Sequence, residues 1–115
     1  MAKFETWLTG DFDRTLDYFD HGILSGSMSA SYEDGSDCTL GTTRCAVRVY
    51  ERYSWSGGNR VSLQLTLVGN GERLFLSAIT SGGSQAVFLK INTWGEEAFL
   101  EAVSGFAERW KRGNV

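Results

Sequence analysis

Residues 61–67 read VSLQLTL, and this stretch decides the fold. Its valine and leucines alternate strictly with polar residues, which is the two-residue period of a β-strand with one buried face. Glycine-rich turn signals stand on both sides, SGGN at 56–59 and GNG at 69–71. Tight hairpin turns need residues that tolerate positive φ, as glycine and asparagine do. The stretch therefore predicts a central antiparallel strand that hairpins join to its two neighbours.

Similar patterns extend outward from this strand along the chain. Residues 45–55 and 74–80 have the composition of strands, and a third apolar run covers 86–91 after another Gly-Gly turn. A polar strand is expected at 29–33, ended by a turn at Asp34-Gly35. Because short turns connect these strands, we predict an antiparallel meander.

Two amphipathic helices flank the meander. After a short opening strand at 4–8, apolar residues recur at helical spacing over 12–23, and Gly22 marks the expected end of the helix. Thr93 and Glu96 match a capping box, which predicts that the C-terminal helix begins there. Each helix has one apolar face, so the two most simply cover one face of the sheet.

The composition agrees with one folded domain. The chain has 115 residues, of which 42% are hydrophobic and 22% charged, with 14 glycines and no proline. A chain of this length and apolar content can bury a core without metal or disulfide staples. We therefore predict a single α+β domain over residues 1–115, an antiparallel β-meander of five to six strands with two helices in the order β-α-β4–5-α. The arrangement is similar to the helix-grip fold, in which a terminal helix lies across a curved sheet.

The residue inventory excludes several classes of function. No apolar run is long enough to span a bilayer, and the N-terminus lacks the apolar segment of a secretory signal. We therefore expect a cytoplasmic protein whose two cysteines are reduced thiols. One histidine and two cysteines cannot make a recognisable zinc site, and a net charge of −3 disfavours nucleic acid as a partner. We expect no enzymatic activity, no metal and no cofactor.

The net charge of −3 hides a gradient along the chain. Residues 1–43 carry two cations and eight acids, a net charge of −6, whereas residues 44–73 carry five arginines and two acids, a net charge of +3. The acidic and basic parts either face each other within the fold or across a dimer, or the arginines form an anion site.

The arginines of the second strand of the meander suggest a ligand site. We pair Tyr53 with Val61, because this register matches the apolar faces of the two strands. It places the guanidiniums of Arg48 and Arg52 on the same polar face, where they could hold a carboxylate or phosphate. The alternative is an ordinary solvated polar face. The candidate ligand-binding residues are Arg48, Arg52, Tyr50, Gln64 and Glu51.

Glu51 is the exception among these candidates, because its parity places it with Val47 and Val49 on the apolar face. An unpaired carboxylate is costly there. It either lines a cavity between sheet and helix, or it pairs with an arginine, lies at a frayed strand end, or is redirected by a bulge.

The last two predicted strands are apolar on both sides. Phe75, Ile79 and Phe88 lie opposite Leu74 and Leu76, so helices on one face leave them uncovered. Such patches mark interfaces, and a second copy of the chain would cover this one. The alternatives are one helix on each face, or closure around a ligand.

Few other side chains could carry chemistry. Cys38 and Cys45 flank a short turn signal and could oppose each other across a hairpin, or remain small reduced residues. His21 lies near a predicted helix end, where it would cap the helix or face solvent.

Four segments carry a resemblance to a known family: RCAVRVYERY at 44–53, GGNRVS at 57–62, ITSGGSQA at 79–86 and GEEAF at 95–99. Through them the chain resembles a family of small bacterial proteins of unknown function over nearly its whole length. The resemblance implies a stand-alone bacterial cytoplasmic domain and transfers no function to it. The leading hypothesis is a domain that binds a small anionic or amphipathic molecule. The alternative is a homodimeric structural or interaction protein.

Overall fold

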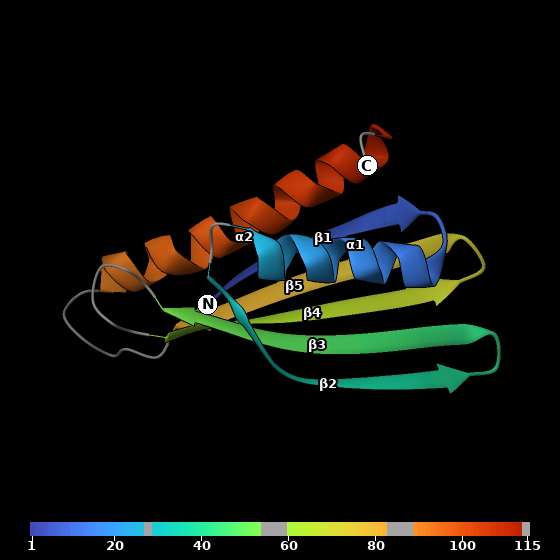
Figure 1. Cartoon of the computed structure of the whole chain (residues 1–115), viewed down its shortest axis with the longest axis horizontal. Coiled ribbons are helices and arrows are strands. Elements are labelled where there is room, and N and C mark those ends of the chain that lie inside the picture. Colours follow the sequence, from blue (N-terminus) through green and yellow to red (C-terminus); the bar gives the residue numbers. More distant parts are fainter. Residues whose placement is uncertain (27–28, 54–59, 83–88, 114–115) are drawn as a thin grey trace.

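The computed structural model describes residues 1–26, 29–53, 60–82 and 89–113. The elements are β1 (Ala2–Thr9), α1 (Phe12–Ser25), β2 (Ser31–Leu40), β3 (Thr43–Tyr53), β4 (Arg60–Asn70), β5 (Arg73–Gly82) and α2 (Leu89–Lys111). The strands form one antiparallel sheet in the spatial order β1-β5-β4-β3-β2, and both helices lie on the same side of it (Figure 1). The predicted α+β meander with two helices is confirmed.

The core lies between the helix pair and one face of the sheet. The alternating leucines of β4 and β5 point into it, as the pattern at 61–67 predicted, and meet the apolar stripes of both helices. Phe19 of α1 and Phe99 of α2 are fully buried there. We call this side of the sheet the covered face and the opposite side the open face.

Helix α1 begins as its sequence predicts but ends later. Asp11 is its N-cap and accepts a hydrogen bond from the Arg14 amide at 3.0 Å. The helix does not stop at Gly22, as expected, but continues to Ser25. A Cβ at Gly22 would lie 3.0 Å from the Phe106 ring of α2. The glycine therefore allows the two helices to approach closely.

Strand β2 is longer than predicted, and the turn expected at Asp34-Gly35 is wrong. The strand continues through this dipeptide to Leu40, with a bulge between Tyr32 and Asp34. The chain turns instead at Gly41, which has a φ of 62°. Gly41 has the positive φ that a tight turn needs, whereas Gly35 lies inside the strand without it.

Helix α2 begins at Leu89, which corrects two predictions. The expected strand at 86–91 is wrong for residues 89–91, which are helical; the rest of it, with Phe88 and the turn at 56–59, lies outside the described residues. Thr93 lies inside the helix, so the capping box with Glu96 is also wrong. A short apolar run does not by itself distinguish a strand from a buried helix turn. No helix in the described part of the chain could cross a membrane.

Candidate functional site

The pairing of β3 with β4 divides the predicted ligand site between the two faces. Tyr53 pairs with Arg60 and not with Val61, so the expected register is wrong by one residue. A slip of one residue turns every side chain to the other face. Arg48 and Tyr50 therefore lie opposite Leu65 and Leu63 on the covered face.

The remaining candidates follow the same rule. Arg52 joins the covered face opposite Val61, whereas Glu51 and Gln64 lie on the open face. The sheet itself therefore separates the five candidate residues. The expected cooperation of Arg48 and Arg52 with Gln64 on one polar face does not form.

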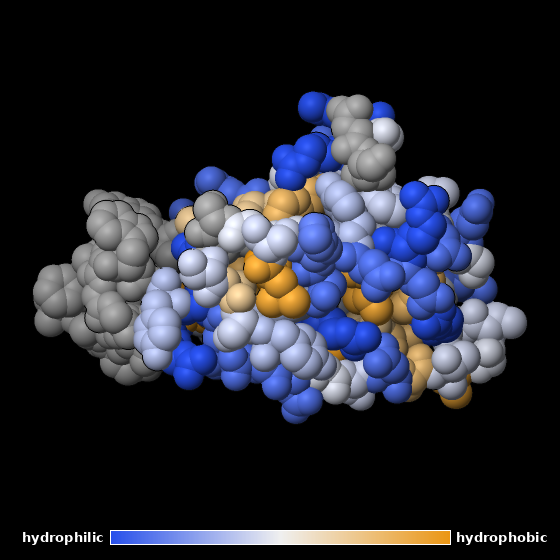
Figure 2. All heavy atoms as spheres, viewed as in Figure 1, coloured by the Kyte–Doolittle hydropathy of each residue, from blue (hydrophilic) through white to orange (hydrophobic). Residues whose placement is uncertain are grey.

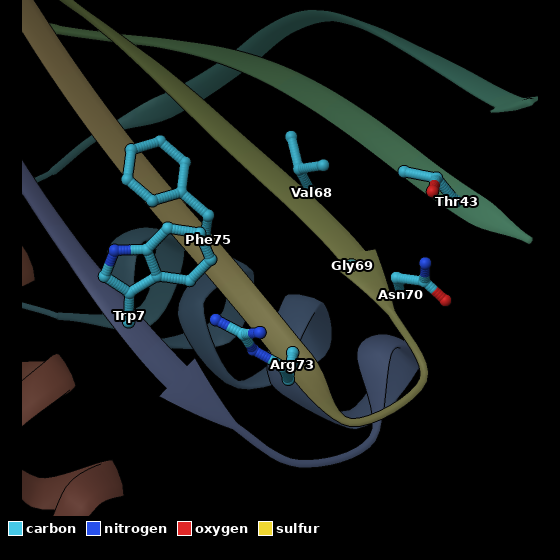
Figure 3. A pocket seen from close by; sticks show the side chains of 7 residues that line it. All are labelled: Trp7, Thr43, Val68, Gly69, Asn70, Arg73 and Phe75. Atoms are coloured by element: carbon cyan, nitrogen blue, oxygen red, sulfur yellow. The ribbon is translucent and has the colours of Figure 1, made fainter.

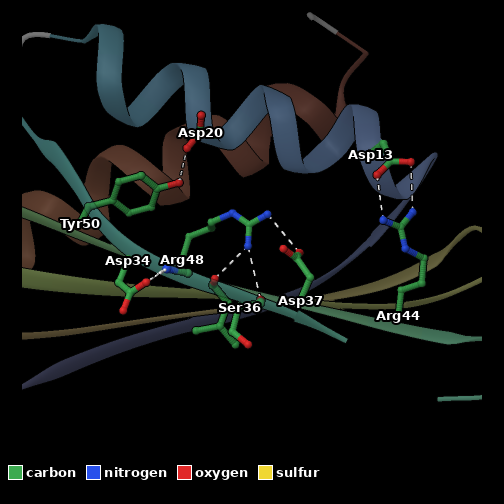
Figure 4. Close-up of polar contacts among 10 residues, drawn as sticks. Asp13, Asp20, Asp34, Ser36, Asp37, Arg44, Arg48 and Tyr50 are labelled. Atoms are coloured by element: carbon green, nitrogen blue, oxygen red, sulfur yellow. Dashed lines mark hydrogen bonds and ion pairs between the residues drawn. The ribbon is translucent and has the colours of Figure 1, made fainter. Parts of the chain in front are cut away.

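The acidic side of α1 explains why the arginine face of β3 turns toward the helices. Arg44 makes a two-pronged hydrogen bond to Asp13 of α1, at 3.0 and 2.9 Å (Figure 4). The hydrogen bond from Arg44 holds the pKa of the Asp13 carboxyl below its usual range. On the same face Tyr50 donates a hydrogen bond of 2.6 Å to Asp20. The opposite charges of the sequence gradient thus meet within the fold.

The guanidinium of Arg48 already has hydrogen-bond partners within the protein. Its guanidinium donates to Asp37 of β2 at 3.0 Å and to the carbonyl oxygens of Val47 and Ser36 at 2.9 and 3.4 Å (Figure 4). Its side chain is 18% exposed. A charged group that is this buried needs such partners, because they replace its lost water. Arg48 therefore has few donors to offer an anion.

A small cleft lies beside Arg48, between α1 and the β2–β3 edge of the sheet. Its volume is about 290 Å³, and its lining residues are Leu16, Asp17, Asp20, Tyr32 and Arg48. Because Asp37 already pairs with the arginine, the two carboxylates of α1 dominate the charge of the cleft. This charge disfavours the anionic ligand that the sequence suggested.

Arg52 contacts the C-terminal helix. Its guanidinium carbon lies 5.2 Å from the ring centroid of Phe99, in a cation–π contact. Burial lowers the pKa of this guanidinium. Its Nε finds no hydrogen-bond partner in the described part of the chain. Arg52 is thus a covered side chain and not a neighbour of Arg48 at a shared site.

The surroundings of Glu51 confirm that it pairs with an arginine, one of the explanations expected for its place among the valines of β3. On the open face its carboxylate forms an ion pair with Arg60 at 2.5 Å and accepts a hydrogen bond from Ser62 at 3.3 Å. Pairing with an arginine therefore accounts for a carboxylate among the valines of β3.

The open face carries a shallow apolar groove that the sequence analysis did not identify. Its volume is about 480 Å³ (Figure 3). The lining residues are Trp7, Thr43, Val68, Gly69, Asn70, Arg73 and Phe75. Trp7 and Phe75 lie side by side, with ring centroids 5.0 Å apart. The Arg73 guanidinium carbon lies 5.4 Å from the Trp7 ring centroid.

The predicted interface residues Phe75 and Ile79 lie on this open face, opposite the helices. Trp7 extends the same apolar surface and is 62% exposed. Its parity in the opening strand, opposite to that of Leu8, was the one sequence signal for its position. Trp7 joins this apolar surface because β1 pairs with β5, and the sequence did not predict which strand β1 pairs with.

The remaining candidates lie apart from one another in the described part of the chain. Within the described ranges, no three His, Cys, Asp or Glu side chains gather to hold a metal ion. His21 is an exposed residue of α1. Glu96, expected to cap a helix, is a buried carboxylate that accepts a hydrogen bond of 2.6 Å from the Gly82 amide.

The comparison with known families identifies one match. The model of a family of unknown function (DUF6054) matches residues 1–111. Comparison with curated proteins and with solved structures found no significant match. The family match confirms the resemblance drawn from the sequence segments.

Proposed function

The chain belongs to this family of unknown function, and we propose that it is a non-enzymatic interaction domain whose open face binds a second copy of the chain. The observation that carries this proposal is the apolar surface that Trp7, Phe75 and Ile79 form opposite the helices. Exposed apolar surfaces of this kind mark interaction sites. The proposal keeps the expected homodimer and relies on no reactive side chain.

The rest of the open face supports an apolar contact. Val47 and Val49 of β3 face the same side as Phe75, beyond the polar column of β4. Both helices lie on the other side of the sheet (Figure 1). The surface over α1 differs, because hydrophilic residues make up most of it in Figure 2, with small hydrophobic patches between them.

The size of the open face suits a second copy. Five strands spaced about 4.8 Å apart, with about ten residues each at 3.3 Å per residue, give a face of roughly 800 Å². Stable protein interfaces bury about 800 Å² per partner. One face against its own copy therefore supplies about the area that a stable dimer needs.

The charges of the open face also allow self-association. They are of both signs and lie around the apolar residues: Lys3, Arg60, Arg73, Glu5, Asp34 and Glu51. A surface with charge of one sign would repel its own copy, whereas a mixed surface can pair cations with acids. This balance favours a second copy over a partner of strongly opposite charge.

The oligomeric state tests the proposal. We expect a dimer in sedimentation equilibrium, and Phe75→Asp should weaken association by roughly 30-fold or more, because it puts a charge at the centre of the apolar contact. Leu24→Asp is the matched control, since it places the same charge on an exposed leucine of α1. It should leave the dimer intact.

Two outcomes would contradict the proposal. A wild-type chain that stays monomeric at high micromolar concentration has no such interface. Equal effects of the two substitutions would mean that the open face is not the contact. Circular dichroism of each variant separates lost association from lost folding.

The groove gives a second candidate function, the binding of a small amphipathic anion. Its volume of about 480 Å³ lies within the range of ligand sites, roughly 300–1,000 Å³. Trp7 and Phe75 supply an apolar wall, and Arg73 supplies a cation above the indole. The anionic or amphipathic ligand expected from the sequence would then bind in the groove and not at Arg48 and Arg52.

Titration with anilinonaphthalene sulfonate, an aromatic anion that fluoresces in apolar sites, tests this candidate. We expect Arg73→Gln to weaken its binding about tenfold, because a charged hydrogen bond to the sulfonate is lost. Arg60→Gln, which removes an open-face arginine outside the groove, should leave the affinity unchanged. Equal affinities of wild type and Arg73→Gln would exclude the groove as an anion site.

A further inference from the structure

We propose that Cys38 and Cys45 form a thiol–disulfide site, in which a small-molecule disulfide oxidises the two facing thiols to an intramolecular bond. Both cysteines are free. The inference does not rest on the proposed dimer, although both cysteines lie on the open face that this dimer would use.

The pairing of β2 with β3 places the two cysteines directly opposite each other. The Cα atoms of directly opposed residues in an antiparallel pair are about 4.5–5.5 Å apart, depending on the kind of pair. Disulfides span Cα distances of about 4.4–6.8 Å. Opposed side chains also point to the same face of the sheet, so the hairpin can form the bond without a change of register.

The short turn between the strands fixes this register. Leu40 pairs with Thr43, and Gly41 adopts the left-handed conformation that a two-residue hairpin turn requires. A slip of one residue would turn one cysteine to the opposite face. The eight-residue segment from Cys38 to Cys45 therefore holds its thiols together at high effective concentration.

Exposure makes the pair accessible. β2 is an edge strand of the sheet, and Cys38 on it is exposed while Cys45 is partly buried. An oxidant therefore reaches Cys38 first. No third metal-ligating side chain gathers with the pair in the described part of the chain, which favours redox chemistry over metal binding.

The oxidation with glutathione disulfide runs in two exchange steps. The Cys38 thiolate attacks one glutathione sulfur, which breaks the glutathione S–S bond, expels one glutathione thiolate and leaves a mixed disulfide on Cys38. The Cys45 thiolate then attacks the Cys38 sulfur and expels the second glutathione. Two electrons pass from the protein to glutathione disulfide, and the two thiol protons end on the released glutathiones.

Oxidation in glutathione buffers of stepped composition tests the site. We expect the free thiols to fall from two to none, with an intact mass lower by two hydrogens and no glutathione adduct. Folded protein should reach half-oxidation at a glutathione disulfide concentration more than tenfold lower than protein in denaturant, because folding holds the thiols opposite each other. Cys45→Ser should stop at the mixed disulfide on Cys38.

Three results would overturn the inference: persistent glutathione adducts on the wild type, disulfides only between chains, or equal oxidation of folded and denatured protein. Parallel oxidation of Phe75→Asp separates this proposal from the dimer. If that variant oxidises and the wild type does not, association covers the pair. If neither oxidises, the thiol site is wrong whatever the oligomeric state.

Discussion

Phe19→Ala is expected to lower the free energy of unfolding by about 3–5 kcal/mol. Phe19 is fully buried on α1. Its ring lies 6.4 Å from that of Phe106 on α2 and 5.2 Å from that of Tyr18, both edge to face. Truncation removes this buried area and leaves a cavity at the point where both helices meet the sheet. Urea unfolding of both proteins measures the difference.

The loss of stability caused by Phe19→Ala should exceed the loss caused by Leu24→Ala on the same helix. Leu24 is 37% exposed, so Leu24→Ala should cost no more than about 1 kcal/mol. Domains of this size have a total stability of roughly 6–17 kcal/mol, so the loss at Phe19 is a large share of it. Similar losses at the two positions would mean that α1 does not pack on the sheet through its Phe19 side.

We expect the protein to become progressively less stable above about pH 10, because the stabilising contribution of the protonated Tyr50 hydroxyl is lost there. The side chain is fully buried, and its hydroxyl donates to Asp20 at 2.6 Å. Burial, followed by this hydrogen bond and the charge of Asp20, raises the pKa of Tyr50 far above its usual value. The protonated hydroxyl therefore stabilises the folded state fully below about pH 10, the pKa of tyrosine in an unfolded chain.

Above that pH the unfolded chain loses the phenol proton while the folded chain keeps it. The free energy of unfolding should then fall with a slope that approaches about 1.4 kcal/mol per pH unit, or by about 2.3 kcal/mol in total between pH 10 and pH 12. Tyr50→Phe lacks this contribution. At pH 8 the variant should be less stable by about 1.5–3 kcal/mol, because it loses a hydrogen bond to a carboxylate.

The two unfolding curves should therefore converge as the pH rises toward 12. Tyr53→Phe, on the same strand but 64% exposed, is the matched control and should parallel the wild type at every pH. Denaturant unfolding at pH 8, 10, 11 and 12 gives the comparison. A constant difference between wild type and Tyr50→Phe would contradict the raised pKa and the burial that causes it.

Local pattern predicted much of the fold. The alternation at 61–67 placed β4 and its core leucines correctly, and the helical spacing of Phe12, Leu16, Phe19 and Ile23 placed α1 on the core. Strand period, helix period and short turns are local properties, so single segments of sequence contain them. The facing cysteines also followed from a nearby turn.

The candidate site could not be predicted in the same way, because it depends on register. The expected register paired the valines of β3 with the leucines of β4, which is reasonable when two strands are considered alone. In the folded chain, α1 brings Asp13 and Asp20 over β3, and Arg44 and Tyr50 meet them. The contacts that decide the register thus lie far apart in the sequence.

The sequence by itself determined the meander, both amphipathic helices and the opposite charges of its two parts. Only the tertiary structure decided which face of β3 the helices cover, and therefore that Arg48 pairs with Asp37. It also decided that β1 pairs with β5, which places Trp7 beside Phe75, a residue that the sequence already predicted to be uncovered. The physical reason is that strand parity fixes which side chains share a face, whereas the choice of face depends on long-range packing. That choice moved the candidate site from the arginines to the open face of the sheet.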